Sequence, residues 1–124
     1  MKALLLATLL FASTAFATIT EVTEGDLNKI MKDGKGVVVI DVYATWCGPC
    51  KIMAKTLEEV DKHYAGKIKF VKMDADKNPS IKNIVPSYPF VLVLKDGKGV
   101  VAMPGATDDP KLVISLLDKV LAAK

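Results

Sequence analysis

A nearly unbroken apolar run, Val37 to Tyr43, constrains the fold of this chain more than any other feature. A strand with one face in water alternates apolar and polar residues, whereas this run contains a single polar residue, Asp41. The pattern therefore predicts a strand that is buried on both faces. Such a strand belongs at the centre of a sheet with helices on its two sides.

The segment after this strand has the periodicity of an amphipathic helix. Apolar residues recur near helical spacing from Ile52 to Tyr64, and the helix is expected to end near Gly66. A second apolar strand follows at 68–73. The order strand, helix, strand predicts a parallel βαβ unit with a right-handed crossover.

The flanking segments complete one domain, because 124 residues suffice for a single hydrophobic core. In chain order we expect an edge strand at 19–22, a helix at 26–31, a short helical or irregular stretch after 78–79, strands at 90–94 and 100–103 joined by a turn at 95–98, and a terminal helix capped within 107–110. The prediction is an α/β fold with a central mixed sheet of about five strands flanked by helices: βαβ, then a β-hairpin and a C-terminal helix.

Charge and composition exclude some partners. All 17 basic residues are lysines, spread among 14 acidic residues, and the net charge is only +3. This distribution gives no basic patch, so we expect no nucleic-acid partner. The apolar fraction of 51% also argues against disorder.

The first residues have the pattern of a secretory signal peptide. A positively charged start precedes an apolar run from Ala3 to Phe11, and 15–17 is an A-x-A cleavage pattern. A membrane anchor or a buried first helix is the alternative, but the run is shorter than the roughly 20 residues that span a bilayer. We expect a signal peptide at 1–17, cleavage after Ala17, and a domain at 18–124 that is periplasmic or secreted.

The chain has two cysteines, Cys47 and Cys50. Structural zinc needs about four protein ligands, and the single histidine, His63, lies too far along the predicted helix to join them. We therefore expect no metal site. A structural disulfide is a second possibility, but a loop this short constrains the unfolded chain little.

Position favours a reactive pair. Cys47 lies where the central strand ends and the helix begins, so free backbone N–H groups and the helix dipole favour its thiolate. That thiolate can attack a disulfide, and Cys50, one turn later, can resolve the mixed disulfide. Gly48 and Pro49 keep the spacer small and stiff, although they also suit an ordinary turn before a helix.

The segment Ile40–Lys51, which contains the sequence WCGPC, closely resembles the active-site segment of thioredoxins, and the match extends over essentially all of 18–124. The resemblance implies a thioredoxin fold and a monomeric protein-disulfide oxidoreductase with no cofactor beyond a redox-active Cys47–Cys50 disulfide. Asp41 resembles the buried aspartate thought to move protons for the inner cysteine, and Lys72 the lysine near it. A structural ion pair is the alternative for Asp41.

The resemblance also implies a substrate-binding surface made of six residues: Trp46, Gly48, Pro49, Tyr88, Pro89 and Gly105. Pro89, rather than Pro86, matches the proline whose preceding peptide bond is cis in the family. Gly105 matches a glycine beside the cysteines, although a turn glycine is the alternative.

Three residues depart from the family pattern. Lys55 replaces a proline that commonly kinks the active-site helix, Tyr43 replaces a tryptophan, and Tyr88 replaces an aliphatic residue. The two tyrosines are expected to border the substrate groove, so they leave substrate preference open.

The resulting hypothesis is an enzyme that reduces disulfides of exported, cysteine-containing proteins, with electrons from a membrane thiol–disulfide donor. The Gly-Pro spacer favours reduction because the resemblance is to reductants. Two alternatives remain: a periplasmic disulfide oxidant or isomerase, and a peptide-binding or chaperone module without redox turnover.

Overall fold

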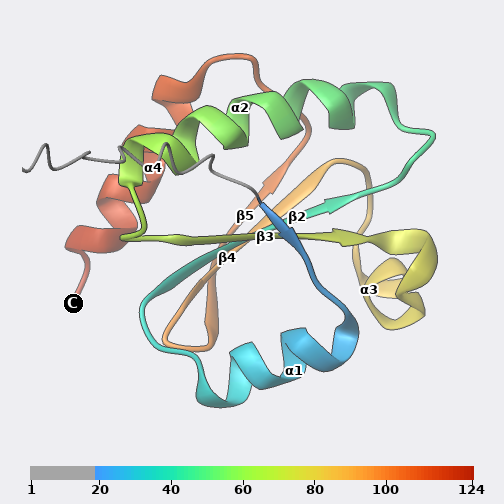
Figure 1. Cartoon of the computed structure of the whole chain (residues 1–124), viewed down its shortest axis with the longest axis horizontal. Helices are drawn as coiled ribbons and strands as arrows, with labels where there is room; N and C mark the ends of the chain where they lie inside the picture. The colour runs from blue at the N-terminus through green and yellow to red at the C-terminus, as the bar shows by residue number, and fades with distance from the viewer. Residues whose placement is uncertain (1–18) are drawn as a thin grey trace, which may run out of the picture.

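The computed structural model describes residues 19–124, which form a five-stranded mixed sheet between two layers of helices (Figure 1). The strands lie in the order β1-β3-β2-β4-β5. Their bounds are β1 Thr20–Glu21, β2 Val37–Tyr43, β3 Lys69–Asp74, β4 Phe90–Lys95 and β5 Lys98–Pro104. The helices are α1 Glu24–Asp33, α2 Gly48–Tyr64, α3 Pro79–Ile84 and α4 Pro110–Ala122, with a 3-10 turn η1 at Ala75–Lys77.

The predicted α/β architecture is confirmed. β2 pairs parallel with β3 across the α2 crossover and antiparallel with β4, while β4 and β5 form the expected hairpin. Helices α2 and α4 cover one face of the sheet, and α1 and α3 cover the other (Figure 1). The expected signal peptide at 1–17 lies outside the described residues. Within 19–124, no helix is long and apolar enough to cross a membrane.

β2 is the central strand and supplies both halves of the core. Residues 37–42 are all buried. Because successive side chains point to opposite faces, Val37 and Val39 pack under α2 and α4, whereas Val38 and Ile40 pack toward α1 and α3. Asp41 has the parity of Val39 and therefore faces α2.

The starts of α1, α3 and α4 can be compared with the starts that the sequence predicts. α4 begins as expected, with Asp109 as N-cap and Pro110 in the first turn. α1 begins at Glu24, earlier than the predicted 26–31, because Thr23 and Asp26 form a capping box. The stretch after Asn78, expected to be helical or irregular, is the helix α3.

A tyrosine ties α2 to α4 over the sheet. The Tyr64 hydroxyl donates to the Asp118 carboxylate at 2.7 Å and lies 3.0 Å from the Ile114 carbonyl oxygen. The α2 helix is therefore anchored at its far end, while its first turn, at the carboxyl end of β2, carries the two cysteines.

Candidate active site

The cysteines lie at the junction of β2 and α2. Cys47 is the N-cap of α2, with an extended backbone, and Pro49 occupies the first helical turn. The backbone N–H of Cys47 donates to the Ala44 carbonyl oxygen at 3.2 Å, which closes the turn between strand and helix. Cys47 and Cys50 form a disulfide with a Cα–Cα distance of 5.4 Å. The expected position of the pair at a strand-to-helix turn is confirmed.

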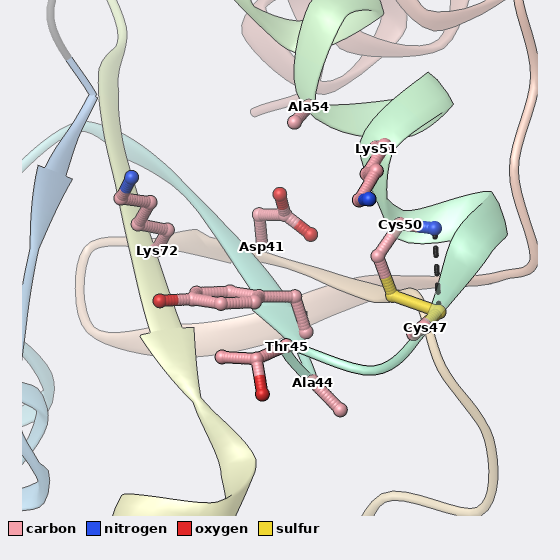
Figure 2. Close-up of a pocket in the computed structure, with 9 residues that line it drawn as sticks. Asp41, Ala44, Thr45, Cys47, Cys50, Lys51, Ala54 and Lys72 are labelled. Atoms are coloured by element: carbon pink, nitrogen blue, oxygen red, sulfur yellow. Dashed lines mark hydrogen bonds between the residues drawn. A yellow bond between two sulfur atoms is a disulfide. The ribbon is translucent and has the colours of Figure 1, made fainter.

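The helix start distinguishes the two sulfur atoms. The Cys47 sulfur accepts a hydrogen bond from the Cys50 backbone N–H at 3.3 Å, drawn as a dashed line in Figure 2. In the disulfide form the exposed fractions of Cys47 and Cys50 are 6% and 4%, so exposure hardly separates them. The cap position does, because free N–H groups and the helix dipole stabilise negative charge at the Cys47 sulfur.

A cavity of about 270 Å³ lies beside the disulfide, as Figure 2 shows. Its lining residues are Asp41, Tyr43, Ala44, Thr45, Cys47, Cys50, Lys51, Ala54 and Lys72. Asp41 is only 3% exposed, and its Oδ1 atom has no hydrogen-bond partner within the described part of the chain. Burial raises the pKa of the Asp41 carboxyl to about 6, although the charge of Lys72 opposes the rise. The carboxyl group can therefore exchange a proton near neutral pH.

Lys72 is held beside Asp41 by strand register. The two residues are direct partners across the parallel β2–β3 pair, and both line the cavity. In Figure 2, Asp41 lies between Lys72 on one side and Cys50 with Lys51 on the other. The structure thus brings together the four residues that the sequence analysis named for chemistry: Cys47, Cys50, Asp41 and Lys72.

The outer rim of the site is aromatic. The Trp46 side chain is 70% exposed, and the Tyr88 ring meets it edge to face with 5.8 Å between centroids. Tyr88 also packs against the cluster that contains Ala44 and both cysteines. The expected substrate residues Trp46 and Tyr88 are therefore side by side next to the disulfide.

Two charged residues that sequence reasoning missed support this rim. The Trp46 indole N–H donates to the Asp76 carboxylate at 3.0 Å, and Lys82 forms an ion pair with Asp76 at 2.8 Å. The hydrogen bond from Lys82 holds the pKa of Asp76 below its ordinary value. Asp76 comes just after β3, and the carboxyl ends of parallel strands meet at one edge of a sheet. This rule could have placed Asp76 near the active site from the sequence alone.

Pro89 and Gly105 meet beside the rim. The Tyr88–Pro89 peptide bond is cis, in agreement with the choice of Pro89 over Pro86. The Gly105 N–H donates to the Pro89 carbonyl oxygen at 3.0 Å. Gly105 has φ +82°, a backbone conformation that favours glycine, and a β-carbon there would enter open space. The backbone conformation is therefore one reason for a glycine at this position.

Tyr43, which is expected to border the substrate groove, lines the Asp41 cavity and packs against the cluster that contains Ala44 and both cysteines. Its hydroxyl donates to the Glu21 carboxylate on β1. No local sequence pattern predicts this contact, because β1 pairs with β3 and is not adjacent to β2, the strand that carries Tyr43.

Comparison with known proteins identifies the family. The thioredoxin family model matches residues 18–118. The chain belongs to the thioredoxin family. It is 42% identical over 103 residues to a thioredoxin of Staphylococcus aureus, across 82% of this chain and 96% of that protein. Among solved structures, the thioredoxin of Plasmodium falciparum aligns with a TM-score of 0.71 at 33% identity, over 82% of this chain and 98% of that one. Mitochondrial thioredoxin 3 of Saccharomyces cerevisiae, in its oxidised form, aligns with a TM-score of 0.70 at 30% identity, over 84% and 97%.

Membership of this family, together with the Cys47–Cys50 pair, makes the chain a thioredoxin-like thiol–disulfide oxidoreductase. Thioredoxins act on cysteine-containing proteins, and in this chain the exposed Trp46 directly precedes the cysteine pair. The disulfide is the group that gains and loses electrons.

The N-cap position generates a prediction for the reduced protein. Cys47 should be alkylated before Cys50 near neutral pH, because the helix start favours its thiolate. Limited treatment with iodoacetamide followed by peptide mass spectrometry measures the order of labelling. Unfolding the protein in urea should abolish the preference, and preferential labelling of Cys50 in the native protein would overturn the assignment.

Proposed function

We propose that this protein reduces disulfides in exported, cysteine-containing proteins, with Cys47 as nucleophile, Cys50 as resolving thiol and Asp41 as proton acceptor. One observation carries the chemistry: Cys47 caps α2, with Cys50 one turn later and the buried Asp41 carboxyl in the adjoining cavity. The signal-peptide pattern at 1–17 supports the exported setting.

The reaction consists of two exchanges. The Cys47 thiolate attacks one sulfur of the client disulfide, so a mixed disulfide forms and the first client thiolate leaves and takes up a proton. Cys50 then loses its proton to Asp41 and attacks the Cys47 sulfur. The intramolecular disulfide forms, and the second client thiolate leaves and takes up the proton that Asp41 then releases. The client gains two electrons and two protons, and the protein is left oxidised.

Asp41 suits the second exchange because of where it lies. A carboxyl group with its usual pKa is a weak base near neutral pH, whereas burial brings the pKa of Asp41 to about 6. The cavity joins Asp41 to Cys50, so the proton has a short path. Lys72 stabilises the carboxylate and thus keeps it available as an acceptor.

Clients would bind across the aromatic rim. Trp46 offers an exposed apolar face beside Cys47. The hydrogen-bonded ladder of β4 begins at Phe90, so the backbone at Tyr88 lies beyond the sheet and can pair with an extended client segment. Gly105, bonded to Pro89, leaves open space on the other side. Backbone pairing tolerates many client sequences.

Turnover requires a reductant for the disulfide. Because the reaction leaves Cys47 and Cys50 oxidised, a second dithiol must return two electrons by the same exchange chemistry. In the exported setting we assign this role to a membrane thiol–disulfide carrier. The protein acts as a monomer in this scheme, because every group used belongs to one chain.

Asp41→Asn tests the proton role. The amide cannot accept a proton, so resolution of the mixed disulfide should slow by about tenfold or more at pH 7. In the parent protein the rate should rise as pH increases through about 6, which gives the rate–pH profile a rising limb. The variant should lack this rising limb. Single-turnover oxidation by excess client, followed by Trp46 fluorescence, measures the rate. Parental rates from pH 6 to 9 in the variant would exclude Asp41 as the acceptor.

Cys50→Ser tests the order of attack and the kind of function. Without the resolving thiol, clients should remain covalently attached to Cys47, whereas Cys47→Ser should retain almost none. Both proteins are recovered from cells by affinity and compared on non-reducing gels. Several adducts that reductant releases are expected. Equal, reductant-insensitive recovery by both variants would indicate a binding module instead.

The direction of electron flow has a separate measurement. A reductase needs a reduction potential well below that of glutathione, and equilibration of the parent protein with glutathione buffers gives that value. A potential above that of glutathione would assign the same site to an oxidant or isomerase.

A further inference from the structure

One wall of the Asp41 cavity is held from the edge of the sheet. Glu21 on β1 is the register partner of Lys72 on β3, and Lys72 is the register partner of Asp41 on β2. Register partners in parallel strands project to the same face, so the three side chains form a row across the sheet with alternating charge. The row runs from solvent-exposed Glu21 to buried Asp41.

Tyr43 bridges the two ends of this row. It lies two residues after Asp41, hence on the same face of β2, and its ring lines the cavity. Its hydroxyl donates to the Glu21 carboxylate, and the Lys72 ammonium lies 6.0 Å from the ring centroid, within cation–π range. Burial, followed by the bond to Glu21, raises the pKa of Tyr43, so the hydroxyl remains a donor at every pH at which the enzyme works.

We propose that Glu21 is a positioning residue, whose hydrogen bond to Tyr43 holds the aromatic ring as the outer wall of the cavity and thereby sets the pH range in which Asp41 accepts a proton. This inference rests on the proposed proton role of Asp41. Glu21 does not itself line the cavity, so it acts on the cavity through Tyr43 and Lys72, which do.

Among the groups that face Asp41, the Tyr43 wall is the one whose position can change how much water reaches the carboxyl group. From α2 the cavity receives Lys51 and both cysteines, and from β3 it receives Lys72. The register partner of Asp41 on β4 is Val91, which carries no charge. Lys72 stabilises the carboxylate, so the remaining preference of Asp41 for the protonated form comes from exclusion of water. Tyr43 is the largest uncharged side chain in the lining.

The direct test is the titration of the Asp41 side-chain carboxyl, followed by ¹³C NMR in the oxidised protein. Tyr43→Phe and Glu21→Ala each break the contact and admit water, so each should lower the Asp41 midpoint by about 0.5 pH unit. The double variant should show no further decrease, because both changes remove one contact. Glu21→Gln keeps an acceptor for the Tyr43 hydroxyl and should shift the midpoint by less than half as much.

Glu58→Ala is the matched control, since Glu58 is an exposed carboxylate on α2 that does not line the cavity, and it should leave the midpoint in place. An unchanged midpoint in Glu21→Ala, or additive shifts in the double variant, would overturn the inference whatever Asp41 does in the reaction. The pH limb of mixed-disulfide resolution should move with the midpoint. A shifted midpoint with an unmoved limb would instead overturn the proton role of Asp41, and with it the part of Glu21 in the reaction.

Discussion

A carboxyl group buried without a hydrogen-bond partner for one of its oxygens is the constraint around which this protein is arranged. Asp41 lies in the central strand among valines and isoleucine, where an unpaired polar atom costs stability. A fold selected for stability alone would place an apolar residue there. The cost is understandable if the group must hold and release a proton near neutral pH, because burial brings its pKa into that range.

The rest of the site follows from the topology that buries this carboxyl. Parallel β2 and β3 end at the same edge of the sheet, and α2 starts there. The cysteine pair therefore lies just past the carboxyl end of the strand that carries Asp41. The same edge carries Asp76, which bonds Trp46 at the rim. In the proposed mechanism, protons are handled inside the cavity, and clients bind at Trp46 and Tyr88 outside it.

Much of this arrangement could be predicted from the sequence, because it follows from patterns within short segments of the chain. The apolar run of β2 predicts a central strand, and the cysteines at its end predict a reactive pair at a helix start. What local patterns could not predict are contacts between distant segments. Trp46 meets Asp76 across 30 residues, and Tyr43 meets Glu21 across 22, each through the order of strands in the sheet.

The central claim, that burial makes Asp41 hold its proton to higher pH, is tested most directly by stability. The oxidised parent and Asp41→Asn are unfolded in urea between pH 4 and pH 8. The unfolded Asp41 carboxyl ionises near 3.8 and the native one near 6, so the parent should lose up to about 3 kcal/mol relative to the variant as pH rises through this window. The loss should be nearly complete by about pH 7, one unit above the native pKa, where the native protein holds a buried charge. A difference in unfolding free energy that stays constant from pH 4 to pH 8 would contradict the account.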